Sequence, residues 1–344
     1  MNKRLRKYLA AIFAFTAAGA SAQPQPGDFY RGKTLEMYVG YTPGGGYDTY
    51  ARLMARHIGD FLPGKPQIVV RNMPGGGGRV LMGFMSNVAP KDGTVLAVAD
   101  QSLPLQQAMR DPTIHFDARQ LLFIGNPAAD NNTVATWHTT GVKTIEDARA
   151  KEIIVGSTGP NTSSQIPYAM NATLGTRFKV VSGYPGGNEL NLSMENGETG
   201  ARGSSPWSTW KATKPDWLRD GKLYIIAQVG LERAADLPDA PLIHELASNA
   251  EDRAALKLLS APAAVGRPLF TTPGVPADRL KALRDAFSAM VKSPDFLEDA
   301  QKQKLDILPV EGEKLQQIVA DIVDAPKAIA DRLNEIIAPP NDAK

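Results

Sequence analysis

Short apolar runs rich in β-branched residues alternate along this chain with segments whose apolar side chains recur at helical spacing. This alternation is typical of layered α/β proteins. The predicted strands are residues 35–39, 67–71, 95–99, 153–156, 178–181 and 224–229. The predicted helices are residues 49–61, 80–87, 144–150, 164–174, 188–195, 277–292, 294–303 and 312–337.

A glycine-rich loop joins the first predicted strand to the first predicted helix. Glycine lets the backbone adopt positive φ and approach a ligand closely, and the N-terminus of a helix attracts negative charge. Asp48 is placed to cap this helix. The loop therefore predicts an anion site, although a tight turn without a ligand would show the same pattern. Its candidate ligand-binding residues are Tyr41, Pro43, Gly44, Gly45, Gly46, Tyr47 and Asp48.

A second loop runs from the predicted strand 153–156 into the predicted helix 164–174. It is rich in hydroxyl and amide side chains, which donate hydrogen bonds to carboxylate oxygens. Two such helix N-termini facing each other across a cleft would suit an anion with acceptors at both ends. The candidates here are Ser157, Thr158, Gly159, Asn161 and Thr162.

The N-terminus resembles an export signal. Lys3, Arg4, Arg6 and Lys7 precede an apolar run, and Ala20-Ser21-Ala22 forms a small-residue cleavage site, so we predict a signal peptide at residues 1–22. The formal net charge of +2, less these four basic side chains, leaves −2 for the mature chain, which gives no reason to expect nucleic acid as a partner. The chain has no cysteine, so a free periplasmic protein fits better than a disulfide-stapled module.

The length predicts more than one domain, because single hydrophobic cores rarely organise more than about 250–300 residues. The order of elements indicates that the chain leaves a first domain near residue 127 and returns near residue 229. We predict domain 1 at residues 23–127 plus 229–344 and domain 2 at residues 128–228. A cleft between two such domains is the usual place for a ligand in open α/β sheets.

The ordered set of motifs resembles one family, the substrate-binding proteins of tripartite tricarboxylate transporters, also called Bug or TctC-like receptors. The resemblance covers nearly the whole mature chain. Its motifs are Pro43-Gly44-Gly45 with Asp48 and Ala51-Arg52, the run at residues 69–78, Ala89-Pro90-Lys91-Asp92-Gly93, the loop after Gly156, Tyr184-Pro185-Gly186-Gly187, Leu237-Pro238 with His244-Glu245, and residues 272–276.

This resemblance implies an α/β periplasmic binding protein of the two-domain "Venus flytrap" type (type II-like), which closes on an organic acid and delivers it to membrane permease subunits. It is expected to act as a monomer. A periplasmic sensor subunit of a two-component system would have the same fold and is the alternative. The remaining candidate ligand-binding residues are Gly76, Ser102, Tyr184, Gly187 and Arg202.

Arg202 marks a departure from the family pattern. An acidic residue, which would bind a ligand's ammonium group, is common near this position, whereas an arginine would pair with a second carboxylate. The sequence therefore favours a di- or tricarboxylate or an aromatic acid over an amino acid. Two tryptophans close by, Trp207 and Trp210, are expected to belong to the core, and Arg52 is expected to form a structural ion pair.

Enzyme classes lack the residue patterns they need. The sequence contains no Gly-x-Ser-x-Gly, Gly-x-Gly-x-x-Gly, phosphate-binding Gly-x-x-x-x-Gly-Lys or His-Glu-x-x-His motif. The histidines are scattered without ligand spacing, at His57, His115, His138 and His244. We therefore expect no catalytic residues, no metal and no cofactor, with an exported hydrolase of unfamiliar design as the remaining enzyme alternative.

Overall fold

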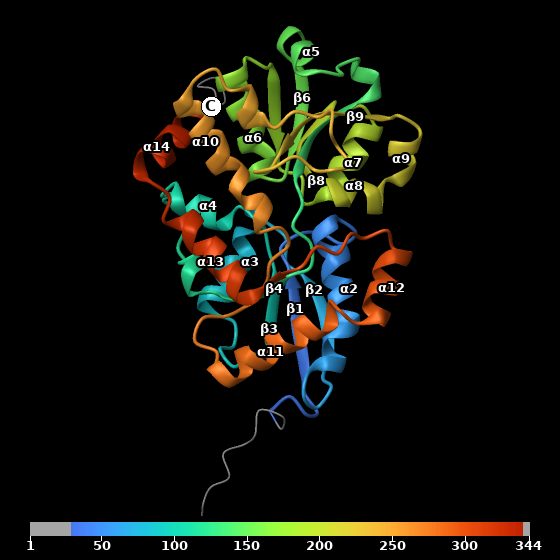
Figure 1. Cartoon of the computed structure of the whole chain (residues 1–344), viewed down its shortest axis with the longest axis vertical. Helices are drawn as coiled ribbons and strands as arrows, with labels where there is room; N and C mark the ends of the chain where they lie inside the picture. Colours follow the sequence, from blue (N-terminus) through green and yellow to red (C-terminus); the bar gives the residue numbers. More distant parts are fainter. Residues whose placement is uncertain (1–28, 340–344) are drawn as a thin grey trace, which may run out of the picture.

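Two sheets organise the chain. The computed structural model describes residues 29–339, so the predicted signal peptide lies outside the described residues. Within residues 29–339, the strands form one six-stranded and one five-stranded sheet, which lie in two lobes stacked along the long axis of the molecule (Figure 1). No helix in this range has the length and hydrophobicity needed to cross a membrane.

The six-stranded sheet forms the core of the first lobe. β1 pairs in parallel with β2 and β3, while β10 runs antiparallel to β3 and β4. All of β3 is buried, because helices cover both faces of the sheet. In spatial order the strands are β11 (Val310–Glu311), β4 (Leu122–Asn126), β10 (Leu269–Thr271), β3 (Val95–Val98), β1 (Thr34–Val39) and β2 (Gln67–Asn72).

The helix that follows β1 buries one apolar face. In α2 (Gly46–Phe61), Leu53, Met54 and Ile58 are buried at helical spacing, and the helix packs on β2 and on α11. The other helices here are α3 (Arg79–Asn87), α4 (Leu103–Ala108), α11 (Ala277–Met290), α12 (Pro294–Lys302) and α13 (Gly312–Val323).

The five-stranded sheet forms the second lobe. β6 pairs in parallel with β7 and β8, and β5 runs antiparallel to β8 and β9. In spatial order the strands are β7 (Phe178–Ser182), β6 (Ile153–Ser157), β8 (Ala201–Pro206), β5 (Asn132–Trp137) and β9 (Leu223–Val229). Its helices are α5 (Ile145–Ala150), α6 (Thr162–Leu174), α7 (Gly187–Glu195), α8 (Trp207–Thr213) and α9 (Pro215–Arg219), and α10 (Ala250–Ser260) packs against α6.

The predicted helix 312–337 is wrong as a single element. The structure divides it into α13 and α14 (Lys327–Ile336), with a break before Pro326. Proline has no N–H to donate and disfavours helical backbone in the residue before it, so the helix ends there. The two halves then part: α13 packs on β4 of the first lobe, whereas α14 packs on α10 and α6 of the second (Figure 1).

The domain boundaries predicted from the sequence stay a proposal. The packing of the helices indicates which segments would belong to each lobe. The connection at residues 127–131 leads from β4 into β5, and the chain re-enters the first sheet at β10. Since α10 and α14 lie against α6, we propose that both belong with the second lobe.

Candidate functional site

A cleft between the lobes gathers residues from both sheets. It holds about 560 Å³ of space free of protein atoms, part of it open to solvent. The residues proposed from the sequence that line it are Tyr41, Gly45, Gly46, Tyr47, Thr158, Asn161, Thr162, Gly187 and Arg202.

Three helix N-termini meet at this cleft. α2 begins after Gly45, α6 after Asn161 and α7 after Gly186, and residues at each start line the cleft. The starts of α2 and α7 are so close that a Cβ on Gly45 would lie 3.6 Å from the backbone N of Gly187. The first N–H groups of a helix have no partner within it, and the helix dipole favours negative charge. This end of the cleft therefore suits an anion.

Arg202 is a buried cation in the cleft wall. It is 7% exposed and lies on β8. Its Nη1 donates to Asn191 Oδ1 at 2.9 Å, its guanidinium lies 4.9 Å from the centre of the Trp210 ring, and its Nε has no partner. Among residues 29–339 no carboxylate pairs with it. Burial lowers the pKa of Arg202 to about 10, so the side chain is still charged at neutral pH.

Tyr41 links the two lobes at the cleft. Its hydroxyl donates to the buried Asp100 and accepts from Asn161 Nδ2 at 3.2 Å. Its ring stacks on that of Tyr47 with 5.1 Å between centroids. Burial raises the pKa of Asp100, although bonds from Ser102 and Tyr41 counteract this effect. The lobes are thus in contact across the cleft.

Asp48 lies behind the glycine loop, outside the cleft lining. The prediction that it caps α2 is wrong in detail, because the loop glycines let the helix begin earlier, with Gly45 as the N-cap. The Asp48 carboxylate instead accepts from Gly44 N–H, Arg52 Nε and Asn72 Nδ2, each at 2.8 Å. The predicted structural ion pair of Arg52 is confirmed. Asp48 thereby holds the glycine loop in place from the side facing away from the cleft.

We expect Asp48→Ala to weaken ligand binding about tenfold while the protein stays folded, because the loop loses about three charge-assisted hydrogen bonds. Burial alone would raise the pKa of Asp48, but the bonds from Arg52, Asn72 and Gly44 outweigh it and hold the pKa below its ordinary value. A depressed pKa stabilises the fold above the unfolded-state value, and the effect is lost as pH falls through the folded-state value. Calorimetric titration measures the affinity, and unchanged affinity would remove this loop from the site. Urea unfolding at several pH values checks the second point: the stability gap between wild type and variant should shrink in acid.

The mouth of the cleft is closed by contacts between the glycine loop and α7. Thr42 Oγ1 donates to Glu189 Oε2 at 2.9 Å, and Asn188 Nδ2 donates to the Pro43 carbonyl at 3.0 Å. Gly44 has φ of +87°, and a Cβ there would lie 2.3 Å from Asn188 Nδ2. Pro43 and Gly44 therefore lie at the rim, where they contact the other lobe.

The other proposed residues lie around the cleft without lining it. Gly76 and Gly159 approach each other from opposite lobes. Ser102 is buried and donates to Asp100, while Ser157 is buried beside Ser163. Tyr184 lies apart, with its hydroxyl 3.4 Å from Glu198 Oε2. Ligand contact by these residues stays a prediction.

Several lining residues were missed by the sequence reasoning. Asp100 and Gln101 follow a predicted strand directly, so their place at its carboxyl end was a usable signal. Asn132 and Ser204 lie on strands that the hydrophobic pattern did not predict. Arg267 is a single charge in a loop, with no local pattern. The missed lining residues are Asp100, Gln101, Asn132, Ser163, Leu190, Ser204, Pro206, Thr209 and Arg267.

Two arginines of the cleft wall each keep a buried donor atom without a partner, Nε of Arg202 and Nε of Arg267, while Gln101 Oε1 is a buried acceptor without one. The Ser204 hydroxyl lies 3.1 Å from both Asn132 Oδ1 and Thr162 Oγ1, and its single proton serves one of these acceptors at a time. Within the part of the chain that the structure describes, no three His, Asp or Glu side chains gather as metal ligands would. The positive charge of Arg202 and the first N–H groups of α2 and α7 suit a ligand rich in acceptors, such as a carboxylate.

The chain is similar in sequence to a known family and to a curated relative. Residues 51–335 match the family model described as "Tripartite tricarboxylate transporter family receptor". The chain is 25% identical over 336 residues to the "UPF0065 protein in gbd 5'region" of Cupriavidus necator, covering 94% of this chain and 95% of the relative.

Solved structures show the same fold. The periplasmic binding protein BugD superposes with a TM-score of 0.71 at 18% identity, over 89% of this chain and 98% of BugD. MatC from Rhodopseudomonas palustris with bound malate gives a TM-score of 0.68 at 17% identity, over 89% of this chain and 99% of MatC. The predicted two-lobed binding-protein fold is confirmed.

Proposed function

This chain belongs to the tripartite tricarboxylate transporter receptor family, and from that premise we propose that it captures an organic acid with two carboxylates in the cleft between its lobes. The proposed reaction is binding alone, with no bond made or broken. The captured acid is delivered to the membrane permease subunits of the transporter. The protein acts as a monomer in the periplasm.

The buried, unpaired Arg202 is the observation that carries this proposal. Removing a guanidinium from water without an anionic partner is costly, and residues 29–339 supply no carboxylate to offset the charge. A ligand carboxylate would satisfy the free Nη2 and the positive charge together. The same carboxylate would lie beside the start of α7, since Arg202 Nη2 is 3.6 Å from a Cβ built on Gly187.

The second carboxylate has its own donors. The first turn of α2 and the hydroxyls and amides at the start of α6 face the same space from two lobes. Charge-assisted hydrogen bonds contribute about 1.5–3 kcal/mol each. Three or four of them are enough for the roughly 8 kcal/mol of a micromolar dissociation constant. MatC, which has the same fold, holds malate, so malate is the natural first probe.

Closure of the lobes couples capture to delivery. The contacts of Tyr41 with Asn161, and of the glycine loop with α7, exist only when the lobes are together. A ligand that touches both lobes favours this closed state by its differential affinity for it. The closed form is what the permease would recognise.

A thermal-shift screen tests the proposal. The mature protein, residues 23–344, is heated with dicarboxylates, tricarboxylates, aromatic acids, amino acids, sugars and phosphates. A ligand at a hundredfold excess over its dissociation constant stabilises the native state by about 2.7 kcal/mol. We expect malate or a related dicarboxylate to raise the melting temperature. Shifts confined to amino acids, sugars or phosphates would contradict the role given to Arg202.

A further inference from the structure

Arg267 is a second buried arginine at the cleft, and its contacts differ in kind from those of Arg202. It is 1% exposed. Nη1 donates to Asp130 Oδ1 at 2.8 Å, and Nη2 donates to Ser208 Oγ at 2.8 Å and to Thr209 Oγ1 at 3.0 Å. The guanidinium lies 4.3 Å from the centre of the Tyr50 ring. Both terminal nitrogens are thus held by the protein and are not free for a ligand.

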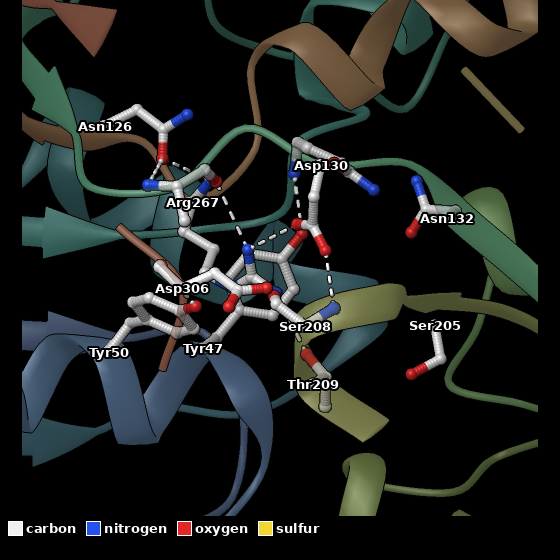
Figure 2. A network of polar contacts seen from close by, with 12 residues as sticks. Tyr47, Tyr50, Asn126, Asp130, Asn132, Ser205, Ser208, Thr209, Arg267 and Asp306 are labelled. Carbon is white, nitrogen blue, oxygen red and sulfur yellow. Dashed lines mark hydrogen bonds and ion pairs between the residues drawn. The ribbon is translucent and has the colours of Figure 1, made fainter. Parts of the chain in front are cut away.

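These contacts join three separate segments of the fold. Arg267 lies just before β10, in the first lobe, and Tyr50 lies on α2 of that lobe. Asp130 lies in the connection between the lobes, and Ser208 is the second residue of α8 in the second lobe. Figure 2 shows the guanidinium between Asp130 on one side and the rings of Tyr47 and Tyr50 on the other.

Asp130 closes the network into a ring. Its Oδ2 accepts the backbone N–H of Ser208 at 2.6 Å while Oδ1 holds Arg267. The backbone N–H of Arg267 donates to Asn126 Oδ1, and Nη1 also donates to the Ala128 carbonyl. The connection between the lobes is therefore bonded to Arg267 along its length, so the network lies where the two lobes are joined.

Thr209 is packed tightly against the start of α2. A Cβ on Gly46 would lie 2.3 Å from Thr209 Oγ1 and 3.2 Å from its Cβ, so the starts of α2 and α8 touch. Thr209 and Gly46 both line the cleft. Its hydroxyl oxygen accepts from Arg267, which leaves the hydroxyl proton free to point elsewhere. A shift of α8 by a fraction of an ångström would change this part of the wall.

We propose that Arg267 is a positioning residue for ligand binding: it is the pivot of the hinge, holding the start of α8 against α2 so that the wall containing Thr209 is preformed before the ligand arrives. The measurement of malate binding in the test depends on the proposed function. The conformational readout uses the empty protein.

The test compares Arg267→Met and Arg267→Lys in the full mature chain. Because the sequence has no cysteine, single cysteines replacing Lys281 on α11 and Arg219 on α9 accept spin labels, one on each lobe, at side chains that are 75% and 73% exposed. We expect Arg267→Met to broaden the distance distribution of the empty protein at least twofold. It should lower the association rate constant for malate about tenfold and change the dissociation rate less than threefold. Arg267→Lys should restore both values to within threefold.

A matched control is Arg279→Met. Arg279 also lies over an aromatic ring, Phe29, and donates to a carbonyl, that of Asp92, but all of these contacts stay within the first lobe. This variant should leave the distance distribution and both rate constants unchanged.

Three outcomes decide the proposal. A folded Arg267→Met variant with wild-type label distances and association rate would overturn it. If that variant fails to fold, Thr209→Val is tested in its place, because it replaces only the hydroxyl to which Arg267 donates. Thr209→Val must then broaden the label-distance distribution and slow the association of malate, and the absence of both effects would contradict the proposal. If wild type binds no malate, that result counts against the proposed ligand, and the label distances of the empty proteins alone decide on the pivot.

Discussion

Arg202→Met will reduce the affinity for the ligand at least a hundredfold while changing the free energy of unfolding of the empty protein by only about 1 kcal/mol. Binding is lost because the variant has no positive charge for the ligand carboxylate, a loss of at least two charge-assisted bonds of about 1.5–3 kcal/mol each. Stability changes little, because two effects oppose each other. The variant no longer buries an unpaired cation, and replacing buried charges by apolar groups of similar size is often neutral or stabilising. It also leaves Asn191 Oδ1 without its donor.

Calorimetric titration with malate and urea unfolding of the empty protein measure the two quantities. The control is Arg219→Met, which removes an arginine whose side chain is 73% exposed on α9 and should alter neither. A variant that unfolds easily and binds normally would reverse the assignment, making Arg202 a structural residue with no role in recognition.

Gly46→Ala will weaken binding about thirtyfold. Gly46 is the first residue of α2 and has ordinary negative φ, so alanine is compatible with the backbone and raises helix propensity by up to about 1 kcal/mol. The added methyl group would clash with two side-chain atoms of Thr209 in the second lobe, Oγ1 at 2.3 Å and Cγ2 at 2.9 Å. Because Thr209 is itself held by Arg267, rotation does not relieve the clash. The lobes are therefore kept apart.

Small-angle X-ray scattering with and without malate reports the closure, and titration reports the affinity. Gly83→Ala on α3 is the matched control, since a Cβ at this helical glycine meets nothing within 4 Å. It should stabilise the protein slightly and leave binding unchanged. Normal compaction of the Gly46→Ala variant on adding malate would show that the starts of α2 and α8 separate easily, contrary to their close contact at Thr209.

The parts of the fold that were predicted correctly are those in which one local pattern determines the structure. The apolar runs of β1, β2, β3, β6, β7 and β9 end within about one residue of the observed strands. Each is a short apolar run that contains β-branched residues, whether the strand is buried like β3 or lies at a sheet edge like β2 and β7. The strands β5 and β8 were not predicted, because their buried residues include the polar Asn132, Thr133 and Ser204. These polar groups are bonded to one another and to the backbone inside the sheet, an arrangement that only the folded partners make favourable.

In the candidate site, too, the features set by a local pattern were predicted and those set by distant partners were not. Glycine loops followed by helices are local, so the starts of α2, α6 and α7 were recognisable, and the family resemblance drew attention to Arg202. Arg267 depends on partners 137 and 59 residues away in the sequence, Asp130 and Ser208, which the chain brings together only through the crossing of the lobes. Pro326, by contrast, was a readable signal that a long helical pattern concealed.

The proposed carboxylate site draws largely on peptide N–H groups at the starts of α2 and α7. This has an evolutionary consequence. A single amino-acid substitution leaves a backbone donor in place unless it introduces proline or a side chain that blocks the approach. Affinity for some acid is therefore robust to random mutation, whereas the choice among acids rests on a few side chains such as Arg202. A lineage of such receptors could change its nutrient by one or two substitutions while never passing through a form that binds nothing.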